Sequence, residues 1–145
     1  MQKSEDIVGC IEEVSFPALS PSTVMAKIDT GAYSGALHCE SIKRVRRGGK
    51  MVLRFKPFHA KSEPIEIDQY KATYVTSSSG HRHRRYIIET DILIKGRCYP
   101  ILIGLSNRKD MKMDVLIGRR FLRKNNILVD VRLNAELDED GGGKE

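Results

Sequence analysis

One short segment carries residues that could do acid–base chemistry: Asp29-Thr30-Gly31, within "AKIDTGAYSGALHC". A catalytic carboxylate needs a fixed and largely dry position. Gly31 lets the backbone turn tightly and approach another segment closely, and the Thr30 hydroxyl can fix the loop by hydrogen bonding. Asp, Thr and Gly are also ordinary turn residues, so the tripeptide alone favours a plain turn after a strand over residues 24–28.

A second segment, "DVLIGRRFL" at residues 114–122, has three apolar residues, a glycine, an arginine and then a short helical pattern. An Asp-Thr-Gly-Ala loop combined with an Ile-Gly-Arg strand and helix resembles the retropepsin fold of aspartic peptidases. The resemblance implies that Asp29 is catalytic and that Gly118 packs beside its loop, where only a bare Cα fits. The residues expected to support this loop are Thr30, Gly31, Ala32, Gly118 and Arg119.

The resemblance covers roughly residues 7–131. Together with the two motifs, "VGCIEEVSFPAL", "RYIIETDILIKG" and "ILVD" look like a bacterial retropepsin-like family often labelled ATP-dependent zinc protease. Its relatives include the RimB proteins, which accompany the RimK glutamate ligases. The family usually has a basic residue and then Thr-Ser after Asp-Thr-Gly-Ala, where this chain has Tyr33, Ser34 and Gly35. Viral retropepsins pair the Arg of the Gly-Arg segment with a nearby acid that this chain lacks, so the sequence leaves the partner of Arg119 open.

Aspartic peptidases use two carboxylates that share one proton and activate a water molecule between them. Two unit charges ~4 Å apart repel by ~4 kcal/mol at an effective dielectric constant of ~20. That repulsion equals about three pKa units, so such a pair titrates as a unit. The chain contains a single Asp-Thr-Gly. The resemblance therefore predicts a homodimer in which Asp29 meets its own image at a two-fold axis.

Aspartic peptidases of this type also need a flap that covers the substrate. The candidate is "TSSSGHRHRRY" at residues 76–86, with Ser77–Gly80 as a mobile tip between two strands. The expected flap and substrate-binding residues are Ser78, Ser79, Gly80, His81, Arg82 and Arg84. The basic flank favours an acidic substrate, which agrees with the resemblance, since RimK-type ligases add glutamates to a ribosomal protein. A charged edge strand that discourages aggregation is the alternative.

The family label also names zinc and ATP, but we expect neither a metal nor another cofactor. The chain has no His-Glu-x-x-His segment, and its four histidines and three cysteines form no tetrad with recognisable ligand spacing. The run "RRGGK" is not a phosphate-binding loop, because Met51 follows the lysine. The basic segment "IKRVRRGGK" at residues 42–50 could contact RNA, although a solvated hairpin is preferred because few aromatic residues are interleaved.

The elements that must position these residues are mostly strands. Several segments have period-two or β-branched patterns typical of strands: "KMVLRFKP", "PIEIDQY", "KATYVT", "RYIIETDILI", "CYPILIGL" and "NILVDV". Tight turns are expected at Gly48-Gly49 and Lys95-Gly96, and Pro100 indicates an edge strand or a bulge. One segment, residues 118–126, has a helical pattern. With the resemblance, this predicts an all-β, retropepsin-like closed barrel with one short C-terminal helix.

Length, composition and charge limit the function classes. A chain of 145 residues fits one domain with its own core. No apolar run approaches the ~18 residues of a membrane span, the N-terminus lacks the pattern of a signal peptide, and three scattered cysteines are not a disulfide framework. We therefore expect a cytoplasmic protein without membrane contact.

The charge is unevenly distributed. The last twelve residues carry −4, so the remainder of the +6 chain carries +10 and favours an anionic partner. We expect a peptidase domain over residues 1–133 and a disordered acidic tail over 134–145.

These patterns together predict an aspartic peptidase that hydrolyses peptide or isopeptide bonds, with a glutamate-rich chain as substrate. The expected associations are a RimK-type ligase and a ribosomal protein. Two alternatives stay open. One is a catalytically silent retropepsin-like dimer that binds acidic peptides or modulates a glutamate ligase; the other is an RNA-binding accessory protein.

Overall fold

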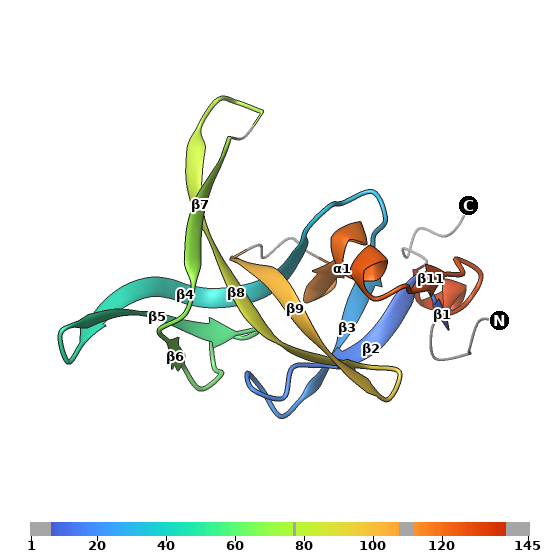
Figure 1. The fold of residues 1–145 in the computed structure, drawn as a ribbon, viewed down its shortest axis with the longest axis horizontal. Helices are drawn as coiled ribbons and strands as arrows, with labels where there is room; N and C mark the ends of the chain where they lie inside the picture. The colour runs from blue at the N-terminus through green and yellow to red at the C-terminus, as the bar shows by residue number, and fades with distance from the viewer. Residues whose placement is uncertain (1–6, 77, 108–111, 139–145) are drawn as a thin grey trace.

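The computed structural model describes residues 7–76, 78–107 and 112–138, and most of its regular structure is β-strand (Figure 1). The strands are β1 (Ile7–Val8), β2 (Ile11–Ser15), β3 (Thr23–Ile28), β4 (Gly35–Arg47), β5 (Lys50–Pro57), β6 (Ile65–Ile67), β7 (Lys71–Thr76), β8 (Arg82–Ile94), β9 (Arg97–Ser106), β10 (Val115–Ile117) and β11 (Leu128–Val129). The helices are α1 (Arg119–Lys124) and the 3-10 helix η2 (Ala135–Asp138).

Strands β3, β2, β8, β9, β4 and β10 are hydrogen-bonded in that order, and β10 pairs again with β3, which closes a barrel. The short strand β10 is parallel to β3 and antiparallel to β4, so it is the strand that closes the ring. A closed ring leaves no unpaired strand edge in this part of the sheet. The expected all-β closed barrel with one short C-terminal α-helix is confirmed.

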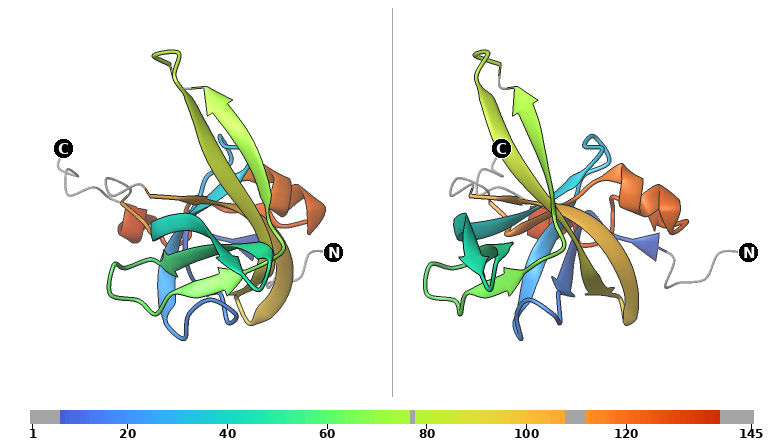
Figure 2. Two further views of the ribbon diagram at one scale, coloured as in Figure 1. Left: turned by 90° about the vertical axis from the view of Figure 1, so that its left-hand side faces the viewer. Right: turned by 60° about the vertical axis from the view of Figure 1, so that its left-hand side comes forward.

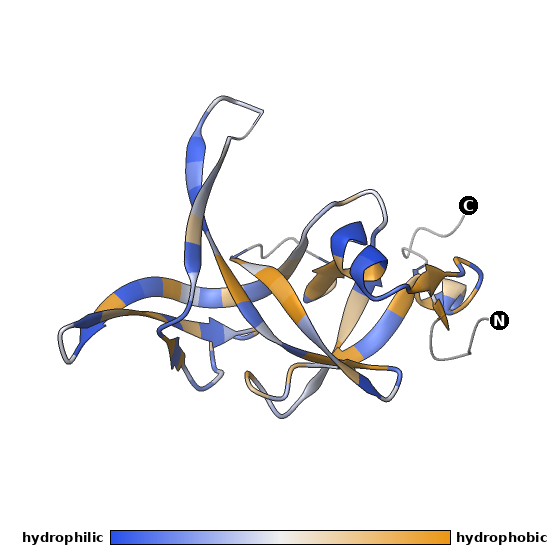
Figure 3. Cartoon of the chain, in the orientation of Figure 1, coloured by the Kyte–Doolittle hydropathy of each residue, from blue (hydrophilic) through white to orange (hydrophobic). Residues whose placement is uncertain are grey.

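Two hairpins project from the barrel, because β4 and β8 have 13 residues each and continue beyond it (Figures 1 and 2). The β4–β5 hairpin turns at Gly48-Gly49, as predicted, and both glycines have a positive φ, 56° and 84°. Such φ values suit the tight turn of a two-residue hairpin. The β7–β8 hairpin carries the expected flap. The β4–β5 hairpin has alternating hydrophilic and hydrophobic stretches, whereas hydrophilic residues predominate toward the end of the β7–β8 hairpin (Figure 3).

The core lies inside the barrel and follows the alternation of the strands. In β9, Ile101, Ile103 and Leu105 are buried, whereas Leu102 between them is exposed. Cys39 is buried in the same core, where burial raises the pKa of its thiol. Pro100 lies in β9 before the pairing with β4 begins at Ile103, so this part of β9 pairs with β8 alone. It is therefore an edge position, where proline, which has no N–H group to donate, is tolerated.

The C-terminal elements differ from the prediction in two respects. Helix α1 is shorter than the predicted segment 118–126. Residues 135–138 form η2 rather than the start of a disordered tail, because the Asn134 Nδ2 donates a hydrogen bond to the Ile11 carbonyl oxygen (2.7 Å) and Lys27 pairs with Asp138 (2.9 Å). The remainder of the predicted tail, 139–145, lies outside the described residues. No described helix has the length and apolar character of a membrane span.

Candidate active site

Asp29 directly follows β3, at the point where β3 runs parallel to β10. Its backbone N–H donates to the Ile117 carbonyl oxygen (2.8 Å), which extends the pairing by one residue. Its Oδ1 accepts a hydrogen bond from the Gly31 N–H (3.0 Å), and its carbonyl oxygen accepts one from the Ala32 N–H (3.1 Å). The half-buried carboxylate is therefore fixed at the base of a tight loop. Within the described residues, Gly31 is its one hydrogen-bond donor.

The loop after Asp29 packs directly on the start of α1. A Cβ on Gly118 would lie 2.6 Å from the carbonyl oxygen of Tyr33 and 2.7 Å from that of Ser34, closer than atoms can approach, so the position accepts only glycine without a shift. The N–H groups of Arg119 and Arg120 donate to the carbonyl oxygens of Ala32 (2.8 Å) and Tyr33 (3.0 Å). These are helix-terminal N–H groups that lack partners within the helix. The loop therefore caps α1, and α1 in turn fixes the loop.

The partner of Arg119, which the sequence left open, is the active-site loop itself. Its Nη1 donates to the Thr30 carbonyl oxygen (3.3 Å), and its guanidinium carbon lies 5.5 Å from the centre of the Tyr33 ring. Within the described residues, the exposed Thr30 hydroxyl has no hydrogen bond. Within one chain it therefore does not fix the loop by hydrogen bonding, as was expected. The backbone of Thr30, and not its side chain, holds the loop to the helix.

The expected flap is the β7–β8 hairpin. Its exposed tip contains Ser78, Ser79, Gly80 and His81. The Ser79 Oγ and the His81 Nδ1 lie 3.2 Å apart. Ser77, the first residue of the predicted tip, lies outside the described residues. The hairpin is long enough to project well away from the barrel (Figure 2).

Arg82 and Arg84 cluster around Tyr74 on one face of this hairpin. The guanidinium carbon of Arg82 lies 4.4 Å from the centre of the Tyr74 ring, and Arg84 donates to the Tyr74 hydroxyl (3.1 Å) and to the Tyr86 hydroxyl (3.4 Å). The hydrogen bond from Arg84, together with the charges of the neighbouring arginines, lowers the pKa of Tyr74. The sequence predicted Arg82 and Arg84 as substrate-binding residues. In the structure they lie on the hairpin face opposite to the one that borders the cavity described next.

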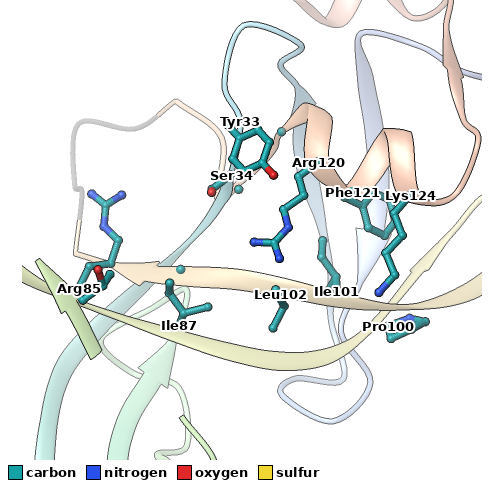
Figure 4. Close-up of a pocket in the computed structure, with 14 residues that line it drawn as sticks. Tyr33, Ser34, Arg85, Ile87, Pro100, Ile101, Leu102, Arg120, Phe121 and Lys124 are labelled. Atoms are coloured by element: carbon teal, nitrogen blue, oxygen red, sulfur yellow. The ribbon is translucent and has the colours of Figure 1, made fainter. Parts of the chain in front are cut away.

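A cavity of about 180 Å³ lies between the loop after Asp29, helix α1 and strands β8 and β9 (Figure 4). Because neighbouring residues of a strand face opposite sides, Thr73, Arg85 and Ile87 border this cavity while Arg82 and Arg84 do not. Helix α1 contributes Arg120 and Lys124, one turn apart on the same face. Sequence reasoning included Arg85 in the basic flank of the flap but missed Arg120 and Lys124. For these two helix residues, their spacing of four residues was the available signal.

Metal-binding residues do not converge in the described part of the chain, which contains no group of three or more His, Cys, Asp or Glu side chains placed to share an ion. His38 in β4 is buried, and its Nε2 lies 2.9 Å from the Glu40 Oε2. His81 lies at the flap tip between β7 and β8, whereas that pair belongs to β4.

Comparison with known proteins gives consistent results. The sequence model of the RimB-like family, "Retropepsin-like aspartic endopeptidase RimB", matches residues 7–138. A "Probable alpha-L-glutamate ligase" from Shewanella pealeana is 29% identical over 146 residues, which cover 97% of this chain and 32% of the ligase. A ligase of the same name from Desulfotalea psychrophila is 26% identical over 146 residues, or 94% of this chain and 30% of the ligase. The chain thus spans about a third of the length of these curated relatives.

A solved structure is also similar over most of the chain. The crystal structure of Lpg0085 from Legionella pneumophila, a protein of unknown function (DUF785), superposes with a TM-score of 0.70 at 27% identity. The match covers 88% of this chain and 94% of the Legionella chain.

Proposed function

The chain belongs to the RimB-like family of retropepsin-like aspartic endopeptidases, and from this membership we propose that two copies of it form an aspartic peptidase. The observation that carries the proposal is the environment of Asp29. One carboxylate oxygen is held by the Gly31 N–H (3.0 Å), and within the described residues no second carboxyl group is hydrogen-bonded to it. A site of this class needs two carboxylates, and the Asp29 of a second copy would supply the other.

In the proposed dimer, the two Asp29 side chains hold one water molecule between them, with a single proton on the pair. The ionised carboxylate takes a proton from the water molecule as the water oxygen attacks the amide carbon. The protonated carboxyl group donates its proton to the amide oxygen, which gives a neutral tetrahedral intermediate with two hydroxyl groups. The first carboxyl group then gives its proton to the amide nitrogen while the second, now ionised, takes a proton from one hydroxyl, so that the C–N bond breaks and the acid and the amine are released. The role of this chain's loop is to hold each carboxylate at a fixed angle through the Gly31 N–H and the contacts of Gly118 and Arg119.

Exposed apolar side chains in the C-terminal segment support the dimer. Leu128, Val131, Leu133 and Leu137 are 53%, 69%, 41% and 46% exposed. All four lie within residues 128–137, and large exposed apolar patches are common where another protein binds. A second copy would remove part of this apolar surface from water, which is a favourable contribution to association.

The proposed substrate is a glutamate-rich chain, for two reasons. The curated relatives are named as glutamate ligases, and about a third of their length resembles this chain. A hydrolase next to a ligase would act on amide bonds of the kind that the ligase makes. In addition, the chain has a net charge of +6, which favours an anionic partner. A glutamylated ribosomal protein in the cytoplasm, associated with a RimK-type ligase, is the form of this substrate that we propose.

A second candidate is a catalytically silent dimer that binds acidic peptides or modulates a glutamate ligase. The same relatives favour it, because a domain that accompanies a ligase within one polypeptide can act by binding alone. The two candidates share the fold and the dimer, and they differ only in whether Asp29 breaks a bond.

The decisive experiment incubates a glutamylated peptide with the wild type, with Asp29→Asn and with Asp91→Asn, and follows the products by mass spectrometry. Asp91 is an exposed residue of β8 and serves as a matched control for the same chemical change. We expect cleavage by the wild type and by Asp91→Asn, and none by Asp29→Asn. Equal cleavage by all three would clear Asp29 of the role, and no cleavage by any would favour the silent dimer. Sedimentation should show a dimer; a monomer at assay concentrations would exclude the shared site.

A further inference from the structure

The cavity beside the Asp29 loop combines an apolar floor with a cationic rim. Its apolar residues are Ile87, Pro100, Ile101, Leu102 and Phe121. Its hydroxyl groups come from Tyr33, Ser34 and Thr73, and its cations are Arg85, Arg120 and Lys124. No Asp or Glu is among the described residues that line it. The lining therefore suits a group that is apolar along its length and negatively charged at its end.

The fold positions the cations around this floor. Arg120 and Lys124 point from α1 toward strand β9, and Arg120 approaches the floor from the side of Tyr33 (Figure 4). The guanidinium carbon of Arg120 lies 5.9 Å from the centre of the Tyr33 ring, a distance at which the ring attracts and orients the cation.

Arg85 is positioned by a glycine. A Cβ on Gly104 would lie 3.2 Å from the Arg85 Cδ, so the bare Gly104 gives the arginine stem room to lie across the neighbouring strand. Figure 4 shows the Arg85 side chain rising on the same side of the strands as α1. The arginine stem is therefore held by packing, and its charged end is left beside the cavity.

None of the three cations is neutralised within residues 7–76, 78–107 and 112–138, where no ion pair includes Arg85, Arg120 or Lys124. Unpaired cations around one cavity repel one another, and an anion between them is attracted by all three. Arginine is well suited to this role, because its planar fork of N–H groups matches a carboxylate.

We infer that this cavity is the subsite for an acidic side chain of the substrate, with Arg85 and Arg120 as the residues that select it. The inference rests on the proposed peptidase function, because the cavity begins at Tyr33, four residues after Asp29. A volume of about 180 Å³ leaves room for several water molecules, and hence for the five heavy atoms of a glutamate side chain. The floor contacts the methylene groups, and the guanidinium groups bind the carboxylate.

The test measures binding separately from cleavage. In an Asp29→Asn background, fluorescence anisotropy gives the affinity for a labelled peptide with consecutive glutamates and for the same peptide with glutamines. Arg120→Gln and Arg85→Gln are each compared with Arg123→Gln, which removes the same charge from an exposed position of α1 outside the cavity lining. We expect the cavity variants to weaken glutamate-peptide binding about tenfold or more. Arg123→Gln should change it less than about twofold, as expected for a screened surface charge, and no variant should alter binding of the glutamine peptide.

Several outcomes would overturn the subsite. Equal losses from Arg120→Gln and Arg123→Gln would assign the affinity to overall charge. Equal binding of the glutamate and glutamine peptides, or no binding of either, would remove the acidic-side-chain preference. Stronger competition by a phosphopeptide or an RNA oligonucleotide would assign the cavity to phosphate. Thermal unfolding of each variant shows whether a loss reflects misfolding, and Arg120→Lys, which keeps a charge without the fork, should recover affinity only in part.

The subsite and the peptidase can fail independently. Selective glutamate-peptide binding without any cleavage by the wild type would leave the subsite standing and remove the peptidase. Cleavage that is unchanged by Arg85→Gln and Arg120→Gln would remove the subsite and leave the peptidase standing.

Discussion

The Nη1 of Arg119 donates a hydrogen bond to the carbonyl oxygen of Thr30, 3.3 Å away and 89 residues earlier in the chain. The contact joins the first residue of α1 to the loop that holds Asp29. The Tyr33 ring lies on the same guanidinium group, at 5.5 Å from its centre to the guanidinium carbon. One arginine side chain thus contacts the loop after Asp29 at two points. These contacts take the place of the acid–arginine pair described above for viral retropepsins.

Replacement of Arg119 should therefore loosen the loop. We expect Arg119→Gln to lower the free energy of unfolding by about 0.5–1.5 kcal/mol, the usual net value of one hydrogen bond. Arg119→Lys should recover only part of the loss, because lysine cannot reproduce the planar fork over the ring. Urea denaturation measures the effect, with Arg123→Gln on the same helix as the control, expected within about 0.5 kcal/mol of the wild type. Equal values for Arg119→Gln and Arg123→Gln would contradict the contact's role.

Gly118 provides a second test of the packing between loop and helix. A methyl group there would meet the carbonyl oxygens of Tyr33 and Ser34 at 2.6 and 2.7 Å, so Gly118→Ala must displace backbone. We expect a loss of about 2–3 kcal/mol in the free energy of unfolding, toward the upper end for overpacking. Gly48→Ala is the control, since a Cβ there would meet nothing within 4 Å. Its positive φ alone should cost about 1 kcal/mol. A Gly118→Ala protein as stable as Gly48→Ala would show that the loop yields easily.

The sequence predicted those features that depend on neighbouring residues. The hairpin turns at Gly48-Gly49 and Lys95-Gly96 follow from the positive φ angles that glycine adopts readily, and the strands around them follow from the alternation of apolar residues. The resemblance of two distant motifs added what alternation cannot give: that Asp29 and Gly118 lie in adjacent segments. In the structure they do, because β3 and β10 are paired in parallel.

The sequence could not predict which face of the flap borders the cavity. Ile87 and Ile88 are consecutive apolar residues, so alternation does not tell which of them points into the barrel. In the structure Ile88 is buried, and Arg85 shares the face of Ile87 at the cavity. The sequence also could not predict that residues 135–138 form η2. This helix depends on a hydrogen bond between Asn134 and Ile11, which are 123 residues apart in the chain.

The C-terminal segment is anchored by a buried acid, Glu12. Its Oε2 accepts hydrogen bonds from the Gly9 N–H (2.7 Å) and the Asn134 Nδ2 (3.3 Å), and the residue is 8% exposed. We expect Glu12→Ala to cost about 1–3 kcal/mol, because it leaves a buried N–H without a partner. Glu12→Gln should cost less, since the amide oxygen can still accept.

Glu13→Ala is the control for this prediction, measured in the same urea titration. Glu13 is an exposed neighbour that accepts a hydrogen bond from the Thr23 hydroxyl (2.7 Å), so its removal should change stability by about 0.5 kcal/mol or less. Amide hydrogen exchange at Leu137, whose N–H donates to the Asn134 carbonyl oxygen, should speed up in Glu12→Ala alone. Unchanged exchange there would show that η2 does not depend on Glu12.

A pH dependence follows from the turn after β11. Hydrogen bonds from the Arg132 side chain, and then from its backbone N–H, lower the pKa of Asp130 from 3.8 to about 2. Because the folded-state pKa is the lower one, the ionised carboxylate stabilises the turn at pH above 3.8, and this contribution disappears as the pH falls toward 2.

Carboxyl chemical shifts followed by NMR across this range should give the low pKa directly. In Arg132→Gln we expect the Asp130 pKa to rise only part of the way to 3.8, since the backbone hydrogen bond at 3.0 Å remains. Arg123→Gln, a charge loss elsewhere on the surface, should leave it unchanged. The same Asp130 pKa in Arg132→Gln and in the wild type would rule out the side-chain hydrogen bonds as its cause.

The proposed shared site makes a prediction that a site within one chain would not make. If each active site needs two Asp29 side chains, adding an equal amount of Asp29→Asn to the wild type should lower its cleavage rate to about half after subunit exchange. Random pairing makes about a quarter of the dimers fully wild type, whereas all of them were wild type before mixing. Because mixing also doubles the number of dimers, about half of the original number of wild-type dimers remains. Loss by dissociation cannot explain such a drop, because added protein favours association. Adding Asp91→Asn instead should raise the rate. A rate unaffected by Asp29→Asn would mean that one chain carries a complete site.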